Sequence, residues 1–143
     1  MVHTKSILTL QKKAVRIIAK KDYYVGDTFN KAHSSPIFKN LNLLNIHDIF
    51  KIEVLTFVYD SLLKTNPIQF HGYYHHAAGI HNTSAVRNEN LTIPYVRTST
   101  YGLKSLKYSG VQIWNSLPVH LRNNKSKKSL SKAVKSIFLE IYQ

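Results

Sequence analysis

Cysteine is absent from this chain of 143 residues, and so is any long apolar run. The absence of cysteine excludes a disulfide scaffold, a thiolate metal site and a cysteine nucleophile, and it is typical of a reducing compartment. Because no run of eighteen apolar residues occurs, no segment is predicted to span a membrane. Lysines interrupt the N-terminal stretch where a signal peptide would need an apolar core. We therefore expect an intracellular protein that is not integral to a membrane.

Acidic residues are also scarce, and no two of them are adjacent or paired at the spacing of a catalytic motif. The seven are Asp22, Asp27, Asp48, Glu53, Asp60, Glu89 and Glu140. The chain has no P-loop, no G-x-S-x-G and no H-E-x-x-H motif. We therefore expect no enzyme activity from this chain alone, with no catalytic residue, no cofactor and no metal site.

Positive charge is abundant and lies mostly at the two ends of the chain. The net charge is +13; residues 1–21 carry six positive and no negative charges, and residues 104–143 carry eight positive and one negative. Two basic blocks that flank a nearly neutral middle favour a polyanionic partner, most often nucleic acid. An anionic membrane surface, or no specific partner at all, is a weaker alternative.

Hydrophobic periodicity predicts a mainly helical α+β protein with one domain over residues 1–143. The stretch 45–64 is apolar on nearly all sides, so we expect it to be a central helix that other elements cover. Asn45 is the expected N-cap, and Pro67 follows the end. A small bundle should surround this helix, with a short two-stranded element formed by residues 91–95 and 101–108.

Amphipathic helices are predicted near both ends of the chain. Residues 4–21 should pack through an apolar face made of Ile7, Leu10, Ala14, Ile17 and Ile18. Ser35 should cap a short helix over 36–41, and Ser126 should cap a basic C-terminal helix. The expected order is a basic helix (1–21), core helices (36–65), a His/Tyr-rich loop (66–90), a strand and W-N-S-L-P segment (91–118) and the C-terminal helix (126–143).

The His/Tyr-rich loop offers four imidazoles, His71, His75, His76 and His81. Spacings of four or five residues allow two imidazoles to converge on a metal ion, but the loop has no cysteine and its only carboxylate is Glu89. A plain polar loop is therefore the favoured interpretation. A small metal-dependent nuclease that uses these histidines is the remote alternative.

A longer motif occupies residues 81–118 and reads H-N-T-S-x9-P-x2-R-T-x3-G-x2-S-x4-G-x3-W-N-S-L-P. Three further blocks precede it in order: L-Q-K-K-A-V-R-I-I (10–18), P-I-F-K-N-L-N-L-L (36–44) and F-V-Y (57–59). Together the blocks resemble the C-terminal region of reverse transcriptases of non-LTR retrotransposons, the LINE and jockey-like elements. The chain departs from the family pattern at Ser84, where arginine is common, and at Val111, where proline is common.

The resemblance implies a module downstream of the polymerase core of an RNA-directed DNA polymerase, beginning near the end of the thumb. The Y/F-x-D-D carboxylates of that core are missing here. Such a module would help to hold template RNA or target DNA, and would be nuclear. The expected partners are nucleic acid and the polymerase domain of the same element. The alternative is a protein-interaction module that docks an acidic partner or that polymerase domain.

Basic and aromatic side chains are the candidate nucleic-acid contacts. Phosphate contacts are expected from Lys12, Lys13, Arg16 and Lys20 of the first helix and from Lys128, Lys132 and Lys135 of the last. Arg97, Lys104 and Lys107 flank Tyr101 and Tyr108, on which unpaired bases could stack, although these tyrosines could instead complete a small core.

Four residues of the motif are expected to have structural roles. Gly110 should form a turn and Trp114 should be a buried anchor. Asn115 should cap the local backbone, and Pro118 should fix the exit of the chain.

Overall fold

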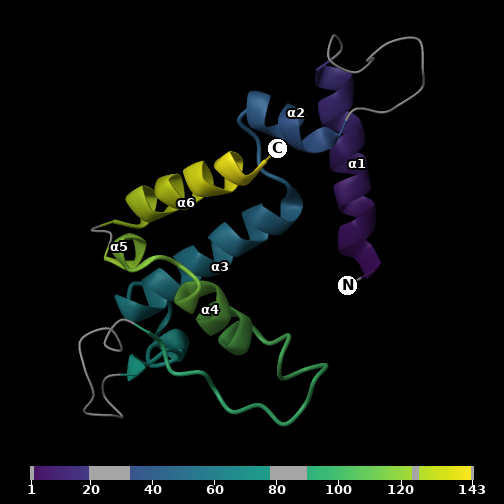
Figure 1. The fold of residues 1–143 in the computed structure, drawn as a ribbon. Coiled ribbons are helices and arrows are strands. Elements are labelled where there is room, and N and C mark those ends of the chain that lie inside the picture. Colours follow the sequence, from purple (N-terminus) through teal and green to yellow (C-terminus); the bar gives the residue numbers. More distant parts are fainter. Residues whose placement is uncertain (1, 20–32, 78–89, 124–125, 143) are drawn as a thin grey trace. The chain divides into compact units, whose positions relative to one another are not determined.

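The computed structural model describes residues 2–19, 33–77, 90–123 and 126–142. Within these ranges the protein is mainly helical, with six α-helices and one short 3₁₀ helix (Figure 1). The helices are α1 (Val2–Ile18), α2 (Ser34–Asn40), α3 (Ile46–Leu62), η1 (Ile68–Phe70), α4 (Leu106–Asn115), α5 (Val119–Arg122) and α6 (Lys127–Ile141). The mainly helical prediction is confirmed. The structure forms two compact units, unit 1 (residues 1–50 and 134–143) and unit 2 (residues 51–133), and the expected single domain stays a prediction.

The predicted two-stranded element is wrong for the described residues, which contain no strand. Leu91 makes one isolated antiparallel bridge with His76, and the stretch 106–108 lies at the start of α4. The side-chain amide of Asn115 occupies both backbone groups of Leu91, which removes the partners that a neighbouring strand would need. The local alternation of residues 91–95 therefore reflects burial of Leu91 rather than sheet pairing.

In unit 1, α1 is attached to the connection between α2 and α3 by the side-chain amide of Gln11. Its Nε2 donates to the carbonyl of Leu44 at 2.8 Å, and its Oε1 accepts from the amide of Ile46 at 2.9 Å. The Ile46 amide belongs to the first turn of α3, where backbone donors have no partner within the helix. Gln11 therefore satisfies one of these donors while it sets the orientation of α1.

The predicted packing face of α1 is wrong. Val15 is buried at 2% exposure, whereas Leu10 and Ile17 are 64% and 70% exposed. At 3.6 residues per turn, the side that carries Gln11 and Val15 lies roughly 90° around the helix from the predicted face. The two hydrogen bonds of Gln11 fix this side of the helix against the chain, so the apolar row remains on the surface.

The caps of the predicted helices follow the sequence in two cases out of three. The Oδ1 of Asn45 accepts from the amides of His47 and Asp48 at 2.9 and 3.1 Å, and the Oγ of Ser126 accepts from the amide of Ser129 at 3.2 Å. The cap of α2 is instead His33, whose Nδ1 accepts from the amide of Ser35 at 3.4 Å. The helix therefore begins before Ser35, and the predicted Ser35 cap is wrong.

A buried polar cluster joins the C-terminus of unit 1 to the N-cap of α3. The hydroxyl of Tyr142 donates to Oδ2 of Asp48 at 2.6 Å and accepts from the backbone amide and Nδ2 of Asn45 at 3.0 and 2.7 Å. Tyr142 and Asp48 are 9% and 7% exposed. Burial of the hydroxyl, and its hydrogen bond to Asp48, raise the pKa of Tyr142.

Replacing Tyr142 with phenylalanine should lower the free energy of unfolding at pH 7 by about 1–3 kcal/mol, because the buried Asp48 and the partly buried Asn45 lose their hydrogen bonds to its hydroxyl. The raised pKa means that the unfolded chain releases this proton first. The contribution of Tyr142 is therefore present below a pH of about 10 and declines above it. In urea unfolding from pH 9 to pH 11, the difference between the wild type and Tyr142→Phe should shrink. The lysines that also titrate in this range are the same in both proteins, so their effect cancels in the difference. A difference that stays constant would therefore contradict a raised pKa of Tyr142.

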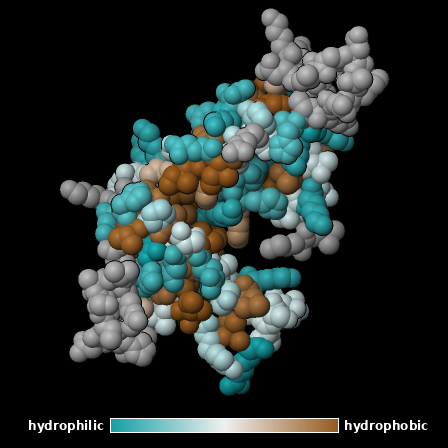
Figure 2. All heavy atoms as spheres, viewed as in Figure 1, coloured by the Kyte–Doolittle hydropathy of each residue, from teal (hydrophilic) through white to brown (hydrophobic). Residues whose placement is uncertain are grey.

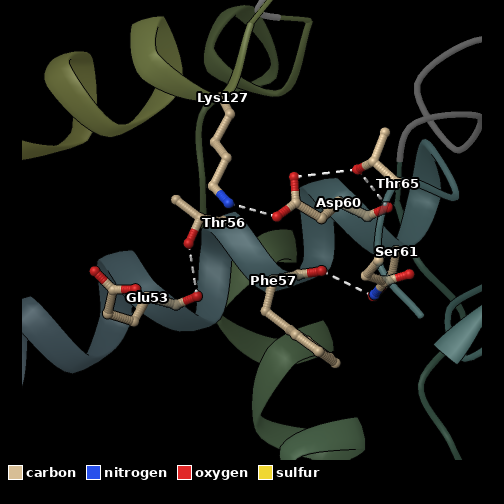
Figure 3. Close-up of polar contacts among 8 residues, drawn as sticks. Glu53, Thr56, Phe57, Asp60, Ser61, Thr65 and Lys127 are labelled. Atoms are coloured by element: carbon tan, nitrogen blue, oxygen red, sulfur yellow. Dashed lines mark hydrogen bonds and ion pairs between the residues drawn. The ribbon is translucent and has the colours of Figure 1, made fainter.

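In unit 2, the C-terminal part of α3 is covered on opposite sides. Leu55 and Val58 are 1% and 0% exposed, as predicted for a central helix, whereas Phe50 in the earlier turns is 54% exposed. Figures 1 and 3 place α4 on one side of this part of α3 and the start of α6 on the other. Val111 of α4 and Leu130 of α6 are both fully buried and complete the core of this unit.

Candidate nucleic-acid interface

The W-N-S-L-P motif holds the start of the loop 91–105 against the end of α4. Trp114 is buried at 3% exposure, as predicted. The amide of Asn115 accepts from the backbone N–H of Leu91 at 2.8 Å and donates to the carbonyl of Leu91 at 2.9 Å. The predicted local capping role of Asn115 is therefore wrong, because its partner lies 24 residues away in the chain. We call this pair of hydrogen bonds the Asn115 clamp.

Arg122 reinforces this region and was not identified from the sequence. Its guanidinium donates to the carbonyls of Asn115 and Leu117 at 2.6 to 2.9 Å and to Oδ1 of Asn90. Pro118, expected to fix the exit of the chain, is the N-cap residue of α5, and α5 carries Arg122. A planar donor with five N–H groups suits three neighbouring oxygens, but nothing in the local sequence pattern shows that they will converge.

Gly110 was expected to form a turn, and this prediction is wrong because the residue lies inside α4. A Cβ at this position would lie 2.4 Å from the hydroxyl oxygen of Tyr74 and 3.0 Å from its Cζ. That hydroxyl donates to the carbonyl of Leu106 at 3.0 Å. Glycine therefore allows the buried Tyr74 ring to lie against the helix backbone. Burial raises the pKa of Tyr74.

Residues 93–107, which we call the tyrosine segment, present aromatic and basic side chains to solvent. Tyr95 is 87% exposed and Tyr101 is 83% exposed. A tight turn supports Tyr101: the amide of Gly102 donates to Oγ1 of Thr98 at 2.9 Å. A Cβ on Gly102 would lie 2.6 Å from the carbonyl oxygen of Thr98, so this turn requires glycine. The segment then enters α4 at Ser105, whose Oγ caps the helix.

The cations predicted here are available on the same segment. Arg97, Lys104 and Lys107 are all exposed. The Nζ of Lys107 lies 5.4 Å from the ring centroid of Tyr73, which is a cation–π distance. Tyr108 is only partly exposed, so it fits the core alternative better than the stacking role. The sequence does not single out Tyr95, because its alternation with Leu91 and Ile93 predicts a strand.

The basic side of α6 is also exposed where it was predicted. Lys128 and Lys132 are exposed and Lys135 is partly exposed, while Leu130 on the other side of the helix is fully buried. Lys127 is different, because its Nζ lies 2.5 Å from Oδ2 of Asp60 (Figure 3). Its charge is paired, whereas neither Lys128 nor Lys132 has a salt bridge to an acid in the described part of the chain.

The basic residues predicted on one side of α1 are not all exposed to solvent. Lys13 is exposed, Lys12 and Arg16 are partly covered, and Lys20 lies outside the described residues. This follows from the orientation of α1, since the side that packs through Val15 also brings Lys12 and Arg16 towards the chain. Of the cations predicted on α1 and described by the structure, only Lys13 is fully exposed, whereas those predicted in unit 2 are all exposed.

The sequence around the exposed cations has no negative charge. Between Glu89 and Glu140 there is no acidic residue, and the same stretch has nine lysines and arginines. Nearly all of this stretch lies in unit 2. A surface built from it has a positive potential that no carboxylate of the same stretch cancels, although Asp60 of α3 pairs with Lys127, and this favours a polyanion over a neutral ligand.

The histidines of the His/Tyr-rich loop lie near a cavity rather than around a metal position. His71, His75 and His76 line a cavity of about 800 Å³ beside the end of α3. The Nε2 of His71 lies 2.7 Å from the carbonyl oxygen of Asn66. Among the residues that the structure describes, no group of three or more histidines and carboxylates is placed to hold a metal ion. His81 lies outside those residues.

None of the helices in the described ranges is both long enough and apolar enough to cross a membrane. Comparison of the chain with models of known protein families, with curated proteins and with solved structures finds no match in any of the three. The resemblance to non-LTR reverse transcriptases therefore stays a prediction that depends on the sequence motifs.

Proposed function

We propose that this chain is a nucleic-acid-binding module of a non-LTR retrotransposon RNA-directed DNA polymerase. In this proposal it holds template RNA or target DNA in the nucleus and has no polymerase active site of its own. The ordered motifs from residue 10 to residue 118 support the family. The observation that supports binding most directly is the tyrosine segment, where two strongly exposed tyrosines alternate with exposed cations.

Single-stranded RNA is the ligand that this segment fits best. Every base has a π-face, so stacking on Tyr95 or Tyr101 is worth about 1–3 kcal/mol per base with little sequence preference. Arg97 and Lys104 lie close to the two tyrosines in sequence and would contact the phosphates between stacked bases. A duplex keeps its bases stacked on each other, so it would use only the phosphate contacts.

The exposed lysines of α6 would add phosphate contacts without sequence information. Lys128 and Lys132 lie in unit 2 with the tyrosine segment. If Arg97, Lys104, Lys107, Lys128 and Lys132 each neutralise one phosphate, log Kd against log salt for single-stranded RNA should have a slope of about 3.5. Kd should therefore rise more than a hundredfold between about 50 and 200 mM salt.

Two pairs of substitutions should have different effects on RNA binding. Tyr95→Ala with Tyr101→Ala should weaken single-stranded RNA binding by about tenfold or more and leave the salt slope unchanged, because stacking releases no counterions. Arg97→Ala with Lys104→Ala should reduce the slope by about 1.4, since two phosphate contacts are lost. Fluorescence anisotropy with a labelled RNA at several salt concentrations measures both effects.

Lys39→Ala with Lys64→Ala is the matched control, because it removes two exposed cations outside the tyrosine segment. This pair should change the salt slope less than the segment pair does. Equal effects of the two pairs would show that binding depends only on total charge. A failure to bind RNA at the lowest salt would overturn the proposal altogether.

A further inference from the structure

A row of exposed apolar side chains runs along one side of α1 in unit 1. The row contains Ile7, Leu10, Ala14 and Ile17, which we call the α1 apolar row. Ile7, Leu10 and Ile17 are 47%, 64% and 70% exposed. Apolar side chains remain at the surface elsewhere too (Figure 2), but those of this row follow one another along a single helix. A row of this kind typically marks a surface that another element covers.

The spacing of the row is that of a coiled-coil seam. Its members are separated by three, four and three residues, which are the a and d positions of a heptad. The row spans about 15 Å along the helix axis, at 1.5 Å per residue. Ala14 leaves room in the middle of the row for a larger side chain of a partner. The row therefore fits another helix that lies almost parallel or antiparallel to α1.

The charge of α1 selects among possible partners. The helix has four basic residues, Lys5, Lys12, Lys13 and Arg16, and no acidic residue. Lys13 directly precedes Ala14 and occupies a g position beside the row. A second copy of α1 would bring only a second Lys13 beside the same seam, where like charges oppose pairing and no carboxylate compensates them. A partner helix with carboxylates at its flanks would gain from the same arrangement.

We propose that the α1 apolar row docks an acidic amphipathic helix of another polypeptide, with leucine or isoleucine at its a and d positions and glutamate or aspartate beside them. The apolar residues exclude water along the seam and provide most of the affinity. Lys13 pairs with a carboxylate and fixes the register. This interaction uses α1 alone, so it does not depend on RNA binding by the tyrosine segment.

A synthetic helix can serve as the probe. A fluorescent peptide of about three heptads, with leucine at a and d and glutamate at e and g, is titrated with the full chain. We expect saturable binding by anisotropy. Leu10→Ser with Ile17→Ser should weaken binding at least tenfold, and Lys13→Glu should weaken it by a smaller factor. Ile68→Ser, which changes an apolar residue of 75% exposure in unit 2, is the matched control and should have no effect.

Several outcomes would overturn the proposal. A scrambled peptide of the same composition that binds equally well would show attraction by charge alone, and unchanged binding by Leu10→Ser with Ile17→Ser would place the peptide elsewhere. A concentration-dependent dimer in sedimentation that this double variant abolishes would identify a second copy as the occupant. Circular dichroism verifies that the variants are folded. Retained RNA binding by the double variant would separate this result from the fate of the proposed function.

Discussion

Replacing Gly110 with alanine is expected to lower the free energy of unfolding by about 2–4 kcal/mol, as overpacking and loss of a buried hydrogen bond together imply. The new Cβ would lie 2.4 Å from the Tyr74 hydroxyl oxygen, so the ring must move and give up its hydrogen bond to the carbonyl of Leu106. Urea unfolding followed by circular dichroism measures the loss. A loss of stability is unusual for a change from glycine to alanine, since alanine normally stabilises a helix interior by about 1 kcal/mol over glycine.

The same substitution in a Tyr74→Leu protein provides the control. Leucine has no atoms where the Tyr74 hydroxyl lies, so the added methyl group should fit. Gly110→Ala should then be neutral or should stabilise by up to about 1 kcal/mol, as helix propensity predicts. An equal loss in both backgrounds would show that Tyr74 is not the reason for glycine at this position.

Asn115→Asp is expected to cost about 2–4 kcal/mol at pH 7, because a partly buried hydrogen bond is replaced by the repulsion of two oxygens. A carboxylate can still accept from the Leu91 amide, but it cannot donate to the Leu91 carbonyl. Protonation of the aspartate restores one O–H donor. The loss of stability relative to the wild type should therefore become smaller as the pH falls towards about 4.

Gln112→Glu is the matched control for this prediction, because it makes the same chemical change at an exposed position of α4. It should change the free energy of unfolding by no more than about 0.5 kcal/mol. If Asn115→Asp costs no more than Gln112→Glu, the Asn115 clamp does not hold the loop. A loss that is the same at pH 4 and pH 7 would also contradict it.

Four helices, α1, α2, α3 and α6, could be predicted from the sequence because their signals are local, whereas the start of α4 was predicted as a strand and α5 was not predicted. Periodic apolar residues mark α1 and α6, a stretch that is apolar on nearly all sides marks α3, and the caps at Asn45 and Ser126 follow from side-chain chemistry. The orientation of α1 could not be predicted in this way. The apolar row is the stronger sequence signal, but the hydrogen bonds of Gln11 to a distant loop decide which side packs.

The same distinction applies to the candidate site. The exposed cations Lys104 and Lys128, and the exposed Tyr101, were predicted because exposure of polar and basic residues is the general rule. The roles of Asn115 and Arg122 were not, because each contacts a backbone or side-chain oxygen more than twenty residues away. Such contacts produce no periodic pattern and no compositional bias in the sequence, so only the three-dimensional structure shows them.

The Asn115 clamp also has a consequence for the chemical lifetime of the protein. Asparagine followed by a small residue loses ammonia when the next backbone nitrogen attacks its amide, and here the next residue is Ser116. In the folded chain the Ser116 nitrogen donates to the carbonyl of Gln112 at 3.1 Å, while the Asn115 amide holds Leu91. The attacking nitrogen of Ser116 and the amide of Asn115 are both restrained, so we expect the folded protein to slow the deamidation of Asn115.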